Sequence, residues 1–176
     1  MDRPVFLEGE HVSLRPLDTD DASFLQRIVN TPEVRHRIGS FEPYTLGEEV
    51  DWIESRTESD EVHLLITVDE EPVGIIGAHP GVQAWGLVEV GYFIAPEHWG
   101  HGYATDALHC MCRYLFEERR VNKVSAQVYE TNPASQRVLE KVGFIEEGRF
   151  RDEAFIQGEY IDILRYGLLV SDLVDE

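Results

Sequence analysis

The residues from Glu89 to Ala107 (EVGYFIAPEHWGHGYATDA) place a carboxylate, an apolar run, a proline and a glycine loop in immediate succession. The apolar run predicts a buried strand, and the residues after Gly102 predict a helix. Gly100 and Gly102 allow the backbone to turn tightly and approach a ligand, and the unpaired N–H groups of the helix's first turn point toward that ligand. This order of parts predicts an anion site suited to a pyrophosphate.

Two common phosphate-binding motifs do not fit. A P-loop needs Lys and Ser or Thr directly after its second glycine, whereas Tyr103 and Ala104 follow Gly102. A dinucleotide fingerprint needs a third Gly or Ala where Thr105 stands, and it normally opens the first βαβ unit of a domain. A pair of glycines in a plain structural turn remains an alternative at this stage.

A second segment, Glu130 to Phe144 (ETNPASQRVLEKVGF), predicts a well-defined short helix. Asn132 is a good N-cap, Pro133 suits the first helical position, and Gly143 can close the helix in a left-handed conformation. By itself this segment is also compatible with an ordinary capped surface helix.

Together the two segments resemble the GNAT family of acyl-CoA-dependent N-acetyltransferases, in which a Gln/Arg-x-x-Gly-x-Gly/Ala loop precedes an Asn-led helix that ends in Gly-Phe. Trp99 stands where the family usually has Gln or Arg, but such a loop works mainly through backbone N–H groups. The resemblance implies acetyl-CoA as cosubstrate, with no metal, and cofactor contacts from Phe93, Ile94, Ala95, Trp99, Gly100, His101, Gly102, Tyr103, Ala104, Asn132 and Ser135. It also implies an α/β (α+β) fold with a single mixed, mostly antiparallel β-sheet and helices on both faces.

The finer pattern resembles the RimJ/RimL-type branch, which comprises the acetyltransferases of ribosomal-protein N-termini and their many relatives. The branch features are the opening His11 to Leu17 (HVSLRPL), Ser135 three residues after Asn132, and a closing segment from Gly148 to Leu169. In that closing segment the matching residues are Gly158, Tyr160, Asp162 and Tyr166.

Length and composition predict one compact domain over residues 1–176. The chain of 176 residues is 43% hydrophobic, which is enough for one sizeable core, and it shows no linker, repeat, signal sequence or membrane-spanning stretch. We therefore expect a cytoplasmic protein. Cys110 and Cys112 lie two residues apart on an expected helix and face different directions, which argues against a mutual disulfide.

The charge balance restricts the partners. Asp and Glu total 34 against 15 Lys and Arg, and the formal charge of −19 disfavours nucleic acid and anionic membranes as partners. Only two basic residues are lysines, Lys123 and Lys141. This surface resembles that of proteins from salt-loving organisms, and the alternative is an acidic protein whose charge only keeps it soluble.

The expected elements alternate along the chain. The patterns predict a strand at 11–17, a helix near 20–30, a looser region at 31–44, and a helix that starts at a capping box of Thr45 and Glu48. Further strands are expected at 62–68, 73–79, 87–95 and 122–129, with helices after Gly102 and Asn132 and a last strand or hairpin across 150–170.

The resemblance also implies roles in chemistry. A primary amine must be neutral to attack a thioester, and Glu89 resembles the family glutamate that often serves as base, although an outward-facing surface charge is the alternative. The oxyanion would be held by backbone N–H groups near Phe93 to Ala95. Many GNAT enzymes protonate the leaving thiolate with a Tyr where this chain has Leu139, so the serine of the RimJ/RimL-type branch, here Ser135, is the candidate acid.

A zinc site is a weaker interpretation of these residues, whereas the acceptor, the oligomeric state and a non-catalytic alternative stay open. His98, His101, His109, Cys110 and Cys112 crowd one region but lack the paired-cluster spacing of a zinc site. The acceptor, expected between region 31–44 and turn 80–86, is a protein N-terminus or a small amine, and the protein is a monomer or a homodimer. A non-catalytic acyl-CoA-binding module is the competing hypothesis, supported by Trp99 and Leu139.

Overall fold

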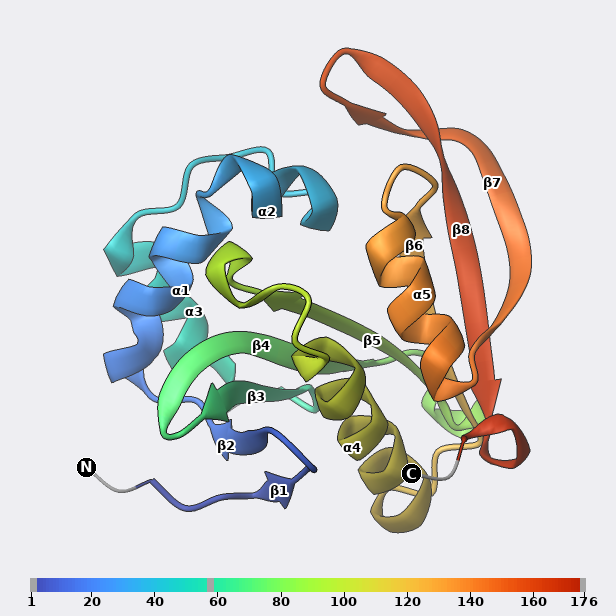
Figure 1. Ribbon diagram of the computed structural model, residues 1–176, viewed down its shortest axis with the longest axis horizontal. Coiled ribbons are helices and arrows are strands. Elements are labelled where there is room, and N and C mark those ends of the chain that lie inside the picture. The colour runs from blue at the N-terminus through green and yellow to red at the C-terminus, as the bar shows by residue number, and fades with distance from the viewer. Residues whose placement is uncertain (1–2, 57–58, 175–176) are drawn as a thin grey trace.

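The computed structural model describes residues 3–56 and 59–174, whose strands form one sheet in the order β1-β2-β3-β4-β5-β6-β8-β7 (Figure 1). The strands are β1 (Leu7–Glu8), β2 (Ser13–Pro16), β3 (Val62–Val68), β4 (Glu71–Pro80), β5 (Leu87–Ile94), β6 (Lys123–Tyr129), β7 (Ile145–Ile156) and β8 (Glu159–Leu169). Within these strands, β5 and β6 pair in parallel and every other neighbouring pair is antiparallel. The expected mixed, mostly antiparallel sheet is confirmed.

The helices cover both faces of this sheet, as expected. They are α1 (Ala22–Val29), α2 (Pro32–Ile38), α3 (Leu46–Ser55), α4 (Tyr103–Glu118) and α5 (Pro133–Val142). In Figure 1, α1, α2 and α3 gather on one side of the molecule, while α4 and α5 lie together on the other. None of the helices in the described ranges is long and apolar enough to span a membrane.

Strand β5 faces both helical layers because its side chains alternate. Val90 and Ile94 belong to the large core that includes α4 and α5, whereas Phe93 packs with the residues of α1 and α3. Even-numbered residues of β5 therefore face the α4–α5 layer, and odd-numbered residues face the α1–α3 layer. Glu89 shares the parity of Phe93, and Tyr92 shares that of Ile94.

The sheet opens between β5 and β6. Their parallel register covers only Leu87 with Lys123, Val88 with Val124, and Glu89 with Ser125. Beyond Glu89, β5 stays paired with β4 as far as Ile94, so the strand continues with one side open. This gap positions the candidate site.

Most of the expected helices and strands are present, and capping residues determine where the helices begin and end. The capping box is formed, with Thr45 Oγ1 accepting from Glu48 N at 3.3 Å and Glu48 Oε2 accepting from Thr45 N at 2.8 Å. Asn132 caps α5, and Gly143 ends it with a left-handed φ of 110°. Both cysteines are buried and free of a disulfide, as predicted.

The region 31–44, expected to be loose, contains helix α2. Pro32 starts it at the first helical position, and Gly39 ends it with a φ of 69°. Seven residues are too few to show a helical repeat of apolar residues. The sequence signals for this helix were therefore its end residues, Pro32 and Gly39. The last hairpin is also longer than expected, since β7 begins at Ile145.

Helix α4 is fixed to the start of the sheet by the buried carboxylate of Asp106. This side chain, 8% exposed, accepts hydrogen bonds from the backbone N–H groups of Glu10 (3.1 Å), His11 (2.6 Å) and Val12 (2.9 Å). Gly9 makes room for it, because a Cβ there would lie 2.4 Å from an Asp106 oxygen. The turn before β2 thus determines where the first turn of α4 lies.

We expect Asp106→Ala to destabilise the fold by about 3 kcal/mol, because three backbone N–H donors, that of Val12 buried and those of Glu10 and His11 partly buried, lose their carboxylate acceptor. That loss corresponds to a fall of roughly 10 °C in the thermal midpoint, measured by circular dichroism. Glu117→Ala, an exposed change on the same helix, is the control and should shift the midpoint little. Equal midpoints for the two variants would contradict the anchoring role.

Candidate active site

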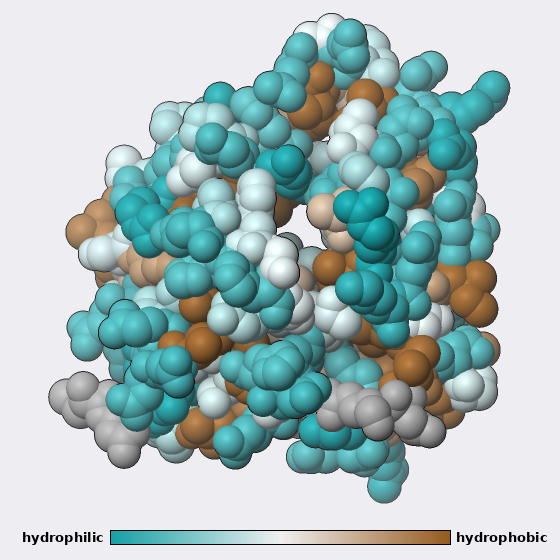
Figure 2. Space-filling view, in the orientation of Figure 1, coloured by the Kyte–Doolittle hydropathy of each residue, from teal (hydrophilic) through white to brown (hydrophobic). Residues whose placement is uncertain are grey.

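A cavity of about 760 Å³ occupies the gap between β5 and β6. Figure 2 shows the molecule hollowed at the centre of this face, with hydrophilic residues around much of the rim. Strands β5 and β6, helix α5 and the loop before α4 wall the cavity, and Val34, Arg37 and Ile38 of α2 close its other end. Both sequence segments singled out above therefore line one site.

The glycine loop has the backbone geometry of an anion site. Gly100 and Gly102 have φ values of 80° and 84°, and a Cβ at either position would meet no atom within 4 Å, so the space in front of the loop is open. The first bond of the α4 ladder runs from Asp106 N to Gly102 O at 3.1 Å. The N–H groups of the first turn, Tyr103 to Thr105, precede that bond and face the opening without an intrahelical acceptor.

Trp99, the residue that departs from the family pattern, joins the loop to its surroundings. Its indole Nε1 donates to the carbonyl oxygen of Ile94 at 2.7 Å, and the guanidinium of Arg37 lies 4.7 Å from the centre of a Trp99 ring. The side chain thus links the end of β5, the loop and helix α2. A structural role of this kind leaves the loop's backbone N–H groups available.

The remaining cofactor candidates are divided between the cavity and its surroundings. The cavity wall includes Phe93, Ile94, Trp99, Gly100, Gly102, Tyr103, Ala104, Asn132 and Ser135. His101 instead stacks on Tyr103 at 5.4 Å in an exposed position, and Ala95 is fully buried with its N–H donating to Val73 O at 2.8 Å. Neither side chain is among those that line the cavity.

The direction of the backbone groups of β5 narrows the choice of an oxyanion donor. In an antiparallel pair, alternate residues exchange hydrogen bonds with the partner strand, and Ala95 bonds to Val73 of that partner. Phe93 shares this parity, and its carbonyl oxygen lies against Gly74 of β4. The N–H groups of Tyr92 and Ile94 therefore point away from β4 and into the gap.

Helix α5 brings Ser135 to the opposite wall, where it meets a residue that the sequence analysis did not select. Asn132 Oδ1 accepts from Ser135 N at 3.3 Å, which fixes the first turn of the helix. Ser135 Oγ lies 2.9 Å from the hydroxyl oxygen of Tyr92. Burial raises the pKa of Tyr92 well above its usual value, so this phenol keeps its proton at neutral pH.

Tyr92 packs in the same layer as Leu139, the α5 position at which the family resemblance leads us to expect a tyrosine. Leu139, at that α5 position, is 1% exposed and packs in the main core. The strand parity of Tyr92 could have revealed its direction, because Val90, Tyr92 and Ile94 alternate with Glu89, Gly91 and Phe93.

Glu89 lies on the other side of β5 at the inner end of the gap. Its Oε2 accepts from Gln127 Nε2 of β6 at 3.2 Å, and the residue opposite it on β4 is His79. Tyr92 follows Glu89 by three positions, which places their Cα atoms roughly 10 Å apart along the strand. The cavity between them is the space in which two reactants could meet.

Two histidines also line this end of the cavity, and the sequence analysis did not select them. Burial, together with His79 and Arg56, lowers the pKa of His63 to about 4, and burial also lowers the pKa of His79. The register of the β3–β4 hairpin brings them together, since His63 pairs with Gly77 and His79 lies two residues further along β4 on the same face. The five histidines and cysteines considered earlier form no ligand group within residues 3–56 and 59–174.

Comparison with known proteins relates this chain to one enzyme family. The family model described as "Acetyltransferase (GNAT) domain" matches residues 11–145. YdaF of Bacillus subtilis, named as a candidate ribosomal N-acetyltransferase, is 29% identical over 169 residues, 92% of each chain. The spermidine N(1)-acetyltransferase of Vibrio cholerae is 27% identical over 172 residues, covering 93% of this chain and 95% of that protein.

Solved structures extend the similarity to the whole fold. The Vibrio cholerae spermidine N-acetyltransferase in complex with CoA and spermine has a TM-score of 0.85 at 25% identity, covering 92% of this chain and 97% of that one. RimJ of Mycobacterium smegmatis in complex with CoA-disulfide shares the fold, with a TM-score of 0.80 at 24% identity over 98% of this chain and 88% of that one. The chain belongs to the GNAT family of acetyl-CoA-dependent N-acetyltransferases and resembles its RimJ/RimL-type branch.

Proposed function

We propose that this single domain, residues 1–176, transfers the acetyl group of acetyl-CoA to a primary amine by direct attack inside the cavity. The observation that carries the proposal is the division of β5 beside the gap. Glu89 lies on the α1–α3 side of the strand, and the Tyr92–Ser135 pair lies on the α4–α5 side. A base and an acid thus approach one opening from opposite layers.

The cofactor end supplies what CoA needs. The pyrophosphate binds the N–H groups of the glycine loop and the first turn of α4. Arg137 and Lys141 of α5 line the same cavity and bring positive charge to a protein of formal charge −19. The extended pantetheine arm then runs along the open side of β5, where backbone groups have no strand partner.

The chemistry follows from this placement. Glu89 accepts a proton from the incoming ammonium group, directly or through water, and the neutral amine attacks the thioester carbon. The N–H of Ile94 donates to the carbonyl oxygen as it gains negative charge. When the C–S bond breaks, Ser135 donates its hydroxyl proton to the thiolate, and the second proton that the attacking nitrogen loses returns to Ser135 through water. Tyr92, which stays protonated, orients the Ser135 hydroxyl.

The charges at the acceptor end favour a single amine, such as a protein N-terminal α-amine, over a polyamine. Among the described lining residues, Glu89 is the one carboxylate, and Arg37 stands at the same end. Glu61, which lies beside His79, is already paired with Arg56 and with His79, so the further ammonium groups of a polyamine would have to displace these partners. Tyr129 narrows the opening, since its hydroxyl oxygen lies 2.6 Å from where a Cβ on Gly39 of α2 would be.

Gly102→Glu should abolish CoA binding, because it puts bulk and negative charge into the proposed pyrophosphate site. Isothermal calorimetry with CoA should show at least a hundredfold loss of affinity. Gly47→Glu is the matched control, since Gly47 is exposed on α3 with nothing but the Thr45 hydroxyl near its Cβ position, at 4.0 Å. Gly102→Ala separates backbone strain from charge, and equal CoA affinity in all four proteins would refute the loop assignment.

Glu89→Gln should lower kcat/KM about a hundred- to ten-thousandfold at neutral pH, because the amine loses its proton acceptor. The deficit should shrink at a pH above the pKa of the amine, where the substrate is already neutral. A free-thiol assay with a peptide bearing an N-terminal α-amine and with spermidine measures both the pH profile and the acceptor preference. Wild-type activity of the variant at low pH would exclude Glu89 as the base, and faster turnover of spermidine would exclude the single-amine preference.

Ser135→Ala and Tyr92→Phe should each lower kcat about ten- to a hundredfold while the dissociation constant of CoA stays nearly constant. Because the two hydroxyls act as one unit, the double variant should be no slower than the worse single variant. Tyr160→Phe, at a position that is 68% exposed on β8, is the control. Losses that multiply in the double variant would show that the hydroxyls act independently.

A further inference from the structure

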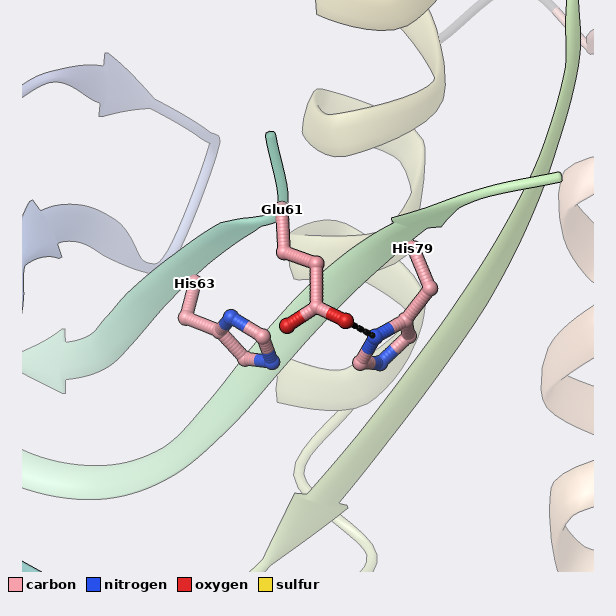
Figure 3. Close-up of side chains that lie close together, drawn as sticks. All are labelled: Glu61, His63 and His79. Atoms are coloured by element: carbon pink, nitrogen blue, oxygen red, sulfur yellow. Dashed lines mark ion pairs between the residues drawn. The ribbon is translucent and has the colours of Figure 1, made fainter. Parts of the chain in front are cut away.

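Three side chains that can bind metal meet at the acceptor end of the cavity (Figure 3). Glu61 precedes β3, His63 lies on β3, and His79 lies on β4. Val62 pairs with Ala78, so Glu61 comes opposite His79, and His63 is on the same face two residues along. One ligand atom from each side chain lies within 4.8 Å of the other two.

Gly77 provides the space into which both imidazole rings reach. It lies opposite His63 in the register, and a Cβ at this position would lie 2.8 Å from Nε2 of His63 and 3.3 Å from Nε2 of His79. The two Nε2 atoms therefore converge above the same point of the backbone. A side chain at position 77 would fill the space between the rings.

Neighbouring groups hold the three side chains in place. Glu61 Oε1 lies 3.2 Å from Nδ1 of His79, and the Trp52 ring packs edge-on against His63 at 5.1 Å. Nδ1 of His63 is buried and has no hydrogen-bond partner among the described residues. The other oxygen of Glu61 contacts the guanidinium of Arg56, so one positive group already lies at the edge of the cluster.

We propose that Glu61, His63 and His79 form a binding site for a transition-metal ion of the Zn²⁺ type, and that the bound ion inhibits acetyl transfer. Two imidazole nitrogens and one carboxylate oxygen are a ligand set that Zn²⁺ accepts, with a fourth position left open. Tetrahedral ligands at zinc bond lengths lie roughly 3.3 Å apart, so small rotations of the side chains close the site.

Inhibition follows from the location. Both histidines line the cavity, and His79 lies opposite Glu89 across the β4–β5 pair. A bound ion would occupy the space through which the amine approaches Glu89, and its charge would repel an ammonium group. The ion is therefore expected to compete with the amine and not with acetyl-CoA, whose loop lies at the other end of the cavity.

Arg56 gives the site a distinctive property. Its guanidinium competes with a metal ion for Glu61, so Arg56→Gln should tighten metal binding, whereas loss of a true ligand should weaken it. Nonspecific attraction of cations would respond to the charges of Arg56 and Glu61 in the same way, so the loss of an imidazole ligand, in His63→Asn or His79→Asn, is the change that distinguishes coordination from charge.

Titration of the purified full-length protein with Co²⁺, followed by visible absorption, tests the site without any need for turnover. One equivalent should bind, Glu61→Gln, His63→Asn and His79→Asn should each weaken binding at least tenfold, and Arg56→Gln should strengthen it. His11→Asn removes a histidine with a side chain 56% exposed away from the cluster and should change nothing. Unchanged Co²⁺ spectra in the His63→Asn/His79→Asn double variant would overturn the site.

Steady-state kinetics then tests the inhibition. Micromolar Zn²⁺ should raise the KM for the amine and leave the KM for acetyl-CoA unchanged, and the double variant should lose this response. Inhibition that competes with acetyl-CoA, or that persists in the double variant, would refute the proposed consequence. Because the Co²⁺ titration does not depend on activity, failure of the metal site and failure of the proposed acetyl transfer give different results.

Discussion

The unequal pairing of β5 is the constraint on which the site depends. Hydrogen bonds with β4 hold the strand straight from Val88 to Ile94, while the pairing with β6 ends at Glu89. A strand that is held on one side only exposes backbone donors and acceptors without losing its shape. Its free edge can therefore bind an extended ligand in the way that it would bind another strand. Its side chains also alternate between the two helical layers on either side of the cavity. The cavity, the base candidate and the hydroxyl pair are consequences of this arrangement.

Contacts elsewhere in the fold position the glycine loop at the end of the gap between β5 and β6. Asp106 ties the first turn of α4 to the backbone before β2, and Trp99 ties the end of β5 to the glycine loop. The loop can therefore have open space in front of Gly100 and Gly102 and still be rigidly positioned. Backbone N–H groups of a fixed helix end, with Arg137 and Lys141 nearby, supply local positive potential. The short-range field at the loop thus opposes the long-range repulsion that an acidic protein exerts on an anionic cofactor.

The sequence predicted those features that depend on local backbone chemistry. The glycine loop, the Thr45 capping box and the Asn132–Gly143 helix were recognisable because the residue types themselves determine the conformation. Helix α2 was missed because seven residues give too little periodicity. Tyr92 and the His63–His79 pair were missed for a different reason. Tyr92 meets Ser135 through helix packing, and His79 meets Glu61 and His63 through strand register, and single-sequence patterns do not contain this information.

The contrast between local backbone chemistry and contacts made through strand register also explains why the acetyl-CoA end of the cavity is easier to predict from the sequence than the acceptor end. The proposed CoA site consists largely of backbone groups, so a change such as Trp99 in the loop leaves the sequence pattern recognisable. The acceptor end is built from side chains of α2, α3, β3, β4 and β6, among them Arg37, Trp52, His63, His79 and Tyr129. Each of these can change without disturbing the sheet, because the β4–β5 ladder does not depend on them. One fold can therefore keep its acyl donor while its acceptor varies, because the charges and shape of that end select the acceptor.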